Sequence, residues 1–438
     1  MRRAALTVGL GFGDEGKGAT VDFLVRHLEA DLVVRYCGGP QCGHNVQLPD
    51  GRHHTFSQFG SGTFAGAATY LGPHVIVDPV GLHYEAAHLR DRMSIEPYRG
   101  LYVDEKCLVT TAYHKALNRL KEISRCDNRH GSCGLGVGET RAYALQHGPE
   151  ALRAGDLNKT AEMMFKLTAI QKHCKQSIEE LELPKGVDPL INLSIDMLHE
   201  SPENLAAHLR EMSKPMQITV GPVGCNRAVV FEGAQGVLLD EWYGFHPYTT
   251  YSTVTLHHAT ELMHSFPVDE VTVIGVTRAY ATRHGAGPFP SYSAALTEQI
   301  SDPGNPKNNW QGSLRCGWLD FELLRYAKSI LPPLDALAVN CLDQFPEVGR
   351  MVPDYAPPDG RGTYTIPTSK ARDLGIAQTR TNLVSAANPW YLDATADEVV
   401  NALNQEIAPV AITAKGSTWE HRRVKNLSWR PVKHLFGD

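Results

Sequence analysis

The sequence has no long apolar run and no strong excess of either charge. No segment approaches the roughly eighteen consecutive apolar residues of a transmembrane helix. The net charge of −6 is small for 438 residues, so we expect no general attraction to nucleic acid or to anionic membranes. The Met-Arg-Arg start precedes an apolar run of only strand length, which argues against a signal peptide. We therefore expect a soluble cytoplasmic protein.

Cysteine and histidine also lack the spacings that mark metal sites or disulfide frameworks. The nine cysteines include no C-x-x-C pair, and an odd, scattered count indicates reduced thiols. Twenty histidines are present, but the pairs His53-His54 and His257-His258 show no metal-site spacing. We expect most histidines to lie at the surface or to serve in packing, and spacing alone predicts no zinc site.

Glycine is abundant, and it is concentrated first between Val8 and Leu24. This stretch predicts a buried strand, a glycine-rich turn and a helix. Gly11 to Lys17 has the G-x-x-x-x-G-K spacing of a phosphate-binding loop, in which backbone N–H groups and the helix N-terminus bind the anion. Gly18 follows where a magnesium-binding Ser or Thr is usual, so we expect Asp14 to supply a metal ligand instead. The alternative is an acidic turn before an ordinary helix.

A second glycine turn follows the next strand. Leu32, Val33 and Val34 predict that strand, and Gly38, Gly39 and Gly43 mark the turn after it. His44 comes directly after this turn. A lone loop histidine is more often structural than catalytic, but the parallel with the first loop favours a functional role.

The rest of the chain predicts alternating strands and helices without repeats, low-complexity tracts or linkers. We predict one α/β domain over residues 1–438, with a P-loop-NTPase-like, mixed and mainly parallel central sheet flanked by helices. Helical and loop excursions are expected, with a helical insertion at approximately residues 150–215. Strands are expected at 217–220, 228–231, 270–276, 336–342 and 408–413, and helices at 78–92, 112–123, 161–181 and 202–212.

A series of motifs spans nearly the whole chain in a fixed order. They are GDEGKG (13–18), VVRYCGGPQCGHN (33–45), GSCGLGVG (131–138), FEGAQGVLLD (231–240), PYTT (247–250), TRHGAGPFP (282–290) and CGWLD (316–320). The series resembles adenylosuccinate synthetase, which joins aspartate to the 6-position of IMP using GTP. The resemblance implies a homodimeric, Mg²⁺-dependent ligase of purine biosynthesis with GTP, IMP and aspartate as substrates.

The chemistry of such a ligase requires particular residues. Hydroxide is a poor leaving group, so the purine 6-oxygen must first be phosphorylated, with a base for the N1 proton and a metal to spread charge. By resemblance, Asp14 is the base and a magnesium ligand, and His44 donates a proton at the β–γ bridge of the nucleotide. Lys17 and the loop amides stabilise the transferring phosphoryl group. The Gly43 carbonyl is the second magnesium ligand.

The resemblance also assigns binding residues. The GTP-binding residues would be Gly13, Glu15, Gly16, Lys17, Gly18, Arg315, Asp343, Thr413 and Lys415. The acceptor nucleotide would contact Gln41, Ser132, Cys133, Gln235 and Thr250. Asp343 suits the N1–H and 2-amino group of guanine, or else caps a strand end. Cys133 replaces a phosphate-binding Thr of the family, and Arg141 is the nearest match to an arginine supplied by the partner subunit.

The largest departure from the family lies in the amino-donor loop. The family has TTGRPRR before its TGWLD motif, whereas this chain has Asn309, Trp310, Gln311, Gly312, Ser313, Leu314 and Arg315. Only Arg315 remains of the arginine cluster that would hold a dicarboxylate. Either the amino donor has changed or another cation holds it, and Lys307, Arg283 and His284 are the candidates.

Several functions stay open at this point. The first is ligation of aspartate to IMP, and the second is the phage-type reaction with dGMP, or with GMP, as acceptor. The presence of Asp14 weighs against the second, because that branch often has a smaller residue there. A third ligase would use another amino donor. A non-catalytic nucleotide-binding module would need the phosphate loop but not His44.

Overall fold

A large, mainly parallel β-sheet forms the centre of the computed structural model, which describes residues 2–184, 189–307, 310–347, 349–356, 364–369 and 372–435. In the described part the strand order is β19-β18-β15-β11-β1-β10-β2-β5-β7-β9, and β20 pairs with the start of β11. All neighbours from β18 to β9 are parallel, and β19 and β20 pair antiparallel. The predicted fold class is confirmed. The strands are β1 (Arg3–Gly9), β2 (Leu32–Arg35), β5 (Ala68–Leu71), β7 (Leu101–Asp104), β9 (Gln217–Thr219), β10 (Ala228–Glu232), β11 (Glu270–Arg278), β15 (Ala336–Asn340), β18 (Val410–Ala414), β19 (Arg422–Val424) and β20 (Arg430–Pro431).

Strand β1 lies in the middle of this sheet and is buried on both faces. Leu6 and Val8 belong to one hydrophobic core and Ala5 to another, as expected from the two-residue repeat of a strand. Helix α1 (Lys17–Leu28) packs on the Ala5 face, while α8 (His257–Met263) and α10 (Phe321–Ser329) pack on the other. The sheet is therefore covered on both sides, and loops after its parallel strands meet at one edge.

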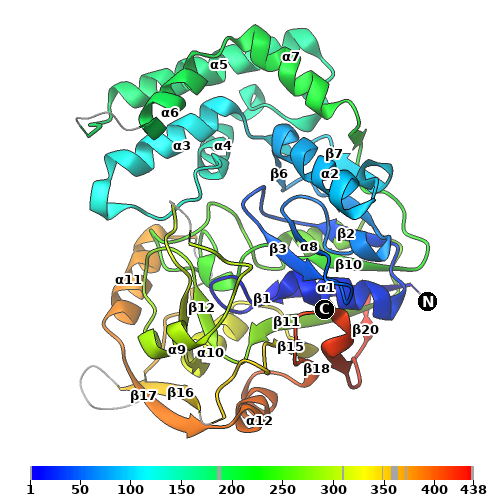
Figure 1. Cartoon of the computed structure of the whole chain (residues 1–438), viewed down its shortest axis with the longest axis vertical. Helices are drawn as coiled ribbons and strands as arrows, with labels where there is room; N and C mark the ends of the chain where they lie inside the picture. Colours follow the sequence, from blue (N-terminus) through cyan, green and yellow to red (C-terminus); the bar gives the residue numbers. More distant parts are fainter. Residues whose placement is uncertain are drawn as a thin grey trace.

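A layer of helices stands above the sheet in Figure 1 and encloses a third hydrophobic core. The predicted insertion, 150–215, contains three of these helices. They pack with helices that precede the insertion, so the layer also includes upstream segments. Its helices are α2 (Pro79–Met93), α3 (Ala112–Ser124), α4 (Val137–His147), α5 (Thr160–Glu179), α6 (Pro189–His199) and α7 (Pro202–Ser213). None of the described helices is long and apolar enough to span a membrane.

Small sheets at the edges carry several loops of interest. A three-stranded sheet, β14-β16-β17, was not predicted, because β17 is largely exposed and lacks a clear apolar alternation. The predicted turn region at 355–362 begins as the end of β16, and its residues 357–362 lie outside the described part. The strands are β3 (His44–Gln47), β4 (His53–Phe56), β6 (Ile76–Val77), β8 (Leu108–Val109), β12 (Ala281–Arg283), β13 (Arg315–Gly317), β14 (Leu319–Asp320), β16 (Gly349–Ala356) and β17 (Asn388–Ala394), and the remaining helices are α9 (Ala294–Gln299), α11 (Leu374–Ser385) and α12 (Ala396–Glu406).

Candidate active site

The predicted phosphate loop connects β1 to α1 and contains several left-handed residues. Gly13 has φ 90°, Asp14 has φ 60° and Gly16, the residue before the helix, has φ 89°. A Cβ atom on Gly16 would lie 2.9 Å from the Asn340 side-chain nitrogen. Asn340 Nδ2 in turn donates to the Glu15 carbonyl at 2.8 Å. Glycine at position 16 is therefore required by both the backbone conformation and the close approach of Asn340.

The loop binds an internal carboxylate. The Gly11 and Gly13 amides donate to Glu15 Oε1 at 3.0 and 2.9 Å, and Lys17 Nζ lies 2.5 Å from Glu15 Oε2. Both side chains are buried. Backbone donors and a lysine thus converge on one anion, which is what a phosphate-binding loop provides. A bound phosphate would need these same donors, so it would compete with the Glu15 carboxylate.

His44 is held by a carboxylate that the sequence analysis did not single out. Glu232, at the end of β10, places Oε1 2.5 Å from His44 Nδ1 and accepts from the Ser61 amide at 3.0 Å and from the Ser61 hydroxyl. Burial alone would raise the pKa of Glu232, but the charges of His44 and Arg35 and the hydrogen bonds lower it to about 2. Glu232 is therefore ionised and orients His44, leaving His44 Nε2 for a ligand.

Gly18 has a steric role in this arrangement. A Cβ atom there would lie 2.8 Å from His44 Cβ and 3.0 Å from the His44 carbonyl carbon. Helix α1 can approach β3 only because this position has no side chain. The absence of a Ser or Thr at position 18 thus has a reason that is visible only in the tertiary structure.

Asp14 is the predicted base of the loop. Burial raises its pKa, while the charges of Arg278 and His284 oppose the rise. Arg278 also holds the loop in place, because its Nε donates to the Asp14 carbonyl and its Nη2 lies 2.7 Å from an Asp302 oxygen. Arg278 was not predicted from the sequence, although its position at the C-terminal end of a buried strand was a usable signal.

The predicted catalytic and acceptor residues line one cavity of about 520 Å³. Its walls come from the phosphate loop, the second glycine turn, the 131–138 loop and the PYTT segment. From the predicted residues it includes Gly13, Asp14, Lys17, Gln41, Gly43, His44, Ser132, Cys133, Gln235, Thr250 and Gln311. The tertiary structure therefore brings together segments that the sequence only placed in order.

Two glutamines give this cavity unpaired polar atoms. The Gln41 side-chain oxygen and nitrogen, and Gln235 Oε1, are buried without a hydrogen-bond partner. Such atoms are costly unless a ligand satisfies them. Ser132 accepts a hydrogen bond from Asn118 at 2.8 Å, and burial raises the pKa of the Cys133 thiol to about 11. Cys133 is therefore a neutral, weak donor next to the Ser132 hydroxyl.

The amino-donor loop also contributes to the cavity wall. The Trp310 indole lies against Gly134, where a Cβ atom would come within 2.9 Å of the ring. Gln311 lines the cavity, and His284 Nε2 lies 3.3 Å from the Gly312 carbonyl. Asn309 lies outside the described residues, and Ser313 is not part of the cavity lining.

The candidate cations near this loop differ in availability. Arg283 is fully buried and donates to the Ala286 and Pro288 carbonyls, so it supports the turn. Arg315 Nη2 donates to the Gly285 carbonyl at 2.6 Å and also supports this turn rather than the phosphate loop. Lys307 is exposed. Of the three candidates, only His284 lines the cavity.

The predicted guanine-binding residues lie at the ends of two neighbouring strands. Asp343 follows β15. Thr413 lies near the end of β18, which pairs in parallel with β15, and Lys415 comes directly after β18. The Leu342 amide donates to the Ala414 carbonyl at 3.1 Å, so the two strand ends stay together. Asp343 and Lys415 are exposed. Asn340, also on β15, contacts the phosphate loop, which connects this group to the loop.

The adenylosuccinate synthetase family model matches residues 6–407. The chain belongs to this family. It is 36% identical over 349 residues to adenylosuccinate synthetase from Desulforudis audaxviator, covering 77% of this chain and 76% of the relative. It is 33% identical over 352 residues to the enzyme from Thermoplasma volcanium, covering 78% and 76%. The protein is therefore a C–N ligase of purine biosynthesis that binds GTP.

Solved structures agree with this fold. Fully ligated adenylosuccinate synthetase from Plasmodium falciparum aligns with a TM-score of 0.74 at 18% identity, covering 96% of this chain and 99% of that one. Cyanophage S-2L succinoaminodeoxyadenylate synthetase, bound to dGMP and dATP, aligns with a TM-score of 0.56 at 16% identity, covering 97% and 95%. At these identities the likeness concerns the fold.

Family members use a divalent metal ion, and the cavity offers hard ligands for one. Asp14 supplies a carboxylate, and Gly43 also lines the cavity, with its backbone carbonyl as the predicted ligand. Carboxylate, carbonyl and phosphate oxygens are the donors that Mg²⁺ prefers. The residues present therefore fit magnesium, which would neutralise charge on the transferring phosphate.

Proposed function

We propose that this ligase transfers the γ-phosphoryl group of GTP to the 6-oxygen of IMP and then joins L-aspartate at C6. The aspartate amine attacks C6, the C6–O bond breaks, and inorganic phosphate leaves, giving adenylosuccinate and GDP. The convergence of Asp14, Lys17 and the His44–Glu232 pair on one cavity carries the proposal. A simple nucleotide-binding module would need only the first two.

Asp14 acts as the base in this proposal. It removes the proton from purine N1 while the 6-oxygen attacks the γ-phosphorus, so that negative charge develops on the nucleophilic oxygen. The raised pKa of Asp14 makes it a stronger base than an exposed aspartate, provided the pH stays above that pKa. Lys17 and the loop amides stabilise the phosphoryl group once the Glu15 carboxylate has yielded them.

His44 acts from its Nε2 atom. Because Nδ1 donates its proton to the ionised Glu232, Nε2 carries a proton only in the imidazolium form. Burial lowers the pKa of His44, and Glu232 opposes this effect. The negative charge of a bound triphosphate would raise that pKa further, so nucleotide binding favours the form of His44 that donates to the β–γ bridge.

The amino donor in the proposal is L-aspartate, held without the family's arginine cluster. His284 is the proposed source of the missing positive charge, and this is supported by its position in the cavity lining and its effect on the pKa of Asp14. Gln311 adds a neutral polar group at the same wall. Magnesium, held by Asp14 and Gly43, would complete the nucleotide site.

We also propose that the chain acts as a homodimer, with Arg141 as the arginine offered to the partner site.

A substrate panel tests the proposal. The purified protein is incubated with GTP, Mg²⁺ and aspartate, with IMP, GMP or dGMP as acceptor, and phosphate and the succino-nucleotide are measured. We expect both products to form with IMP. Turnover with dGMP or GMP alone would assign the alternative acceptor, and IMP-dependent phosphate release without the aspartate adduct would assign another amino donor. Asp14→Asn is the control for adventitious phosphatase activity, and size-exclusion chromatography with light scattering tests the dimer.

A further inference from the structure

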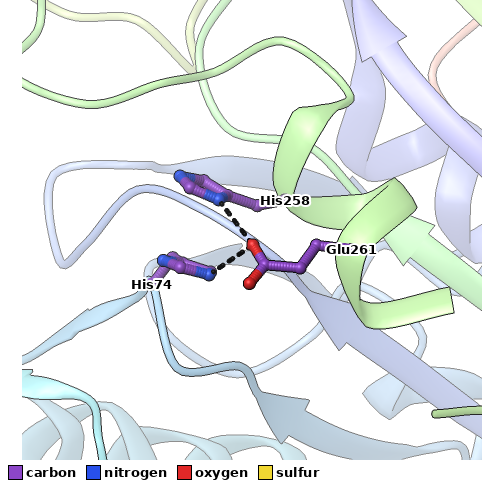
Figure 2. A group of neighbouring side chains, drawn as sticks. All are labelled: His74, His258 and Glu261. Atoms are coloured by element: carbon purple, nitrogen blue, oxygen red, sulfur yellow. Dashed lines mark hydrogen bonds and ion pairs between the residues drawn. The ribbon is translucent and has the colours of Figure 1, made fainter. Parts of the chain in front are cut away.

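Two histidines and a glutamate form a cluster outside the cavity described above. His74 lies in the turn between β5 and β6, while His258 and Glu261 lie one turn apart on α8. Figure 2 shows both imidazoles directed toward the same carboxylate. Glu261 Oε2 is 3.1 Å from His74 Nε2 and 3.6 Å from His258 Nδ1, and the ligand atoms all lie within 4.8 Å of one another.

The surroundings keep both imidazoles neutral. Burial, followed by the charges of His74, His257 and Arg141, lowers the pKa of His258 to about 3. Burial also lowers the pKa of His74, with Glu261 opposing. Neutral imidazole is the form that binds metal ions. His258 Nδ1 is buried and has no hydrogen-bond partner, so a polar atom facing the cluster is left unsatisfied.

We propose that His74, His258 and Glu261 bind a divalent transition-metal ion, of which Zn²⁺ is the expected example. Two imidazole nitrogens and one carboxylate oxygen form a donor set that suits zinc and leaves a fourth position for water. The positive charge of Arg141 weakens the attraction for any cation. An ion that bonds strongly to nitrogen is therefore favoured over Mg²⁺, which would gain only one carboxylate.

Binding requires a modest rearrangement. The two rings are stacked, with centroids 3.6 Å apart and planes at 12°, so their nitrogen lone pairs run side by side. The side chain of His258 is 13% exposed, that of His74 is 29% exposed and that of Glu261 is 59% exposed. His74 and Glu261 are therefore the groups that can tilt until the lone pairs converge. The bound ion would fasten α8 to the β5–β6 turn, two segments far apart in the sequence.

The test measures zinc binding to the full-length protein after dialysis against a chelator, with excess Mg²⁺ present to occupy the nucleotide site. We expect one Zn²⁺ per chain by calorimetry, and a higher unfolding temperature with Zn²⁺ than without, because the ion binds the folded state. The double variant H74A/H258A should lose this site, with affinity at least about tenfold weaker. His208→Ala, an exposed histidine on α7, is the matched control.

The exposed Glu261→Gln variant keeps the test decisive if the double variant does not fold. It should also weaken Zn²⁺ binding. When Co²⁺ is added in place of Zn²⁺, the variant should lack the visible absorption of a tetrahedral site that the wild-type protein shows. Unchanged Zn²⁺ affinity in folded H74A/H258A or in E261Q would overturn the proposal, as would the absence of Zn²⁺ binding to the wild-type protein. Turnover in the ligase assay is not used as the readout, so failure of the proposed function would not affect this result.

Discussion

The phosphate loop and the amino-donor loop form two walls of one cavity and differ in how they are held. In the phosphate loop, Asn340 and Arg278 each donate to a backbone carbonyl, and Gly18 allows His44 to pack against α1. In the amino-donor region, Arg315 donates to a carbonyl of a neighbouring turn. Among the candidate cations Lys307, Arg283 and His284, it is His284 that lines the cavity. In the proposed mechanism the first wall keeps the groups for phosphoryl transfer, whereas the second lacks the arginine cluster that the resemblance predicts there. We infer that the phosphoryl-transfer half of the reaction is retained and that amino-donor binding has changed.

The largest expected effect comes from Asp14→Asn, on the retained wall. Removing the proposed base and metal ligand should lower kcat for IMP-dependent phosphate release by about 10³-fold or more. In the wild type, kcat should fall as the pH drops through the pKa of Asp14, which burial raises above that of an exposed aspartate. Discontinuous phosphate-release assays over a series of pH values measure the kcat of the variant and the pH dependence of kcat in the wild type. Substantial activity in the variant would break the assignment of this wall to phosphoryl transfer.

Glu232→Gln should have the next largest effect. The variant keeps a group near His44 Nδ1 but removes the charge that stabilises the imidazolium, so kcat should fall by about 10²-fold. The alkaline limb of the pH–rate profile, where His44 loses its proton, should move to lower pH. Ser61→Ala is a milder control, because Glu232 keeps the backbone N–H of residue 61. If the alkaline limb does not move, Glu232 does not control proton donation by His44.

His284→Val tests the exchanged wall. The substitution restores the family's residue without restoring its arginines, so KM for aspartate should rise by about tenfold, corresponding to one lost charged hydrogen bond. The KM for GTP should stay within about twofold. Lys307→Ala, an exposed cation nearby, should leave both constants unchanged. If KM for aspartate rises in the lysine variant and not in the histidine variant, the cation has been assigned to the wrong residue.

Gly18→Ala should have the smallest effect on the chemistry and a clear one on stability. The added methyl group would lie 2.8 Å from His44 Cβ, and such overpacking costs about 1–3 kcal/mol of unfolding free energy. Denaturant unfolding measures it. Gly224→Ala is the matched control, since no atom lies within 4 Å of its added methyl group. Equal stability of the two variants would mean that His44 is not held by close packing against α1.

Local patterns predicted a large part of the fold and of the candidate site. The glycine spacing predicted the phosphate loop. Short-range apolar periodicity predicted the buried strands β1, β2, β10 and β11 and the helices α2 and α3. Strand β17 did not, because its exposed residues lack an alternating pattern. Glu232 lies in the FEGAQGVLLD motif, but nothing in the neighbouring sequence indicates that its side chain meets His44.

The sequence by itself determined the family, the order of its motifs and the residue types available for phosphoryl transfer, because these depend on neighbouring positions in the chain. Only the tertiary structure decided which distant groups meet. It placed Glu232 against His44, committed Arg315 to the Gly285 carbonyl, and brought His74 to the helix that carries His258. The physical reason is that side-chain contacts between remote segments depend on strand order and helix packing, which leave no spacing signal in the chain. The G-x-x-x-x-G-K spacing predicted a phosphate-binding loop from the sequence alone. The need for glycine at position 18 became clear only from its contact with His44 in the tertiary structure.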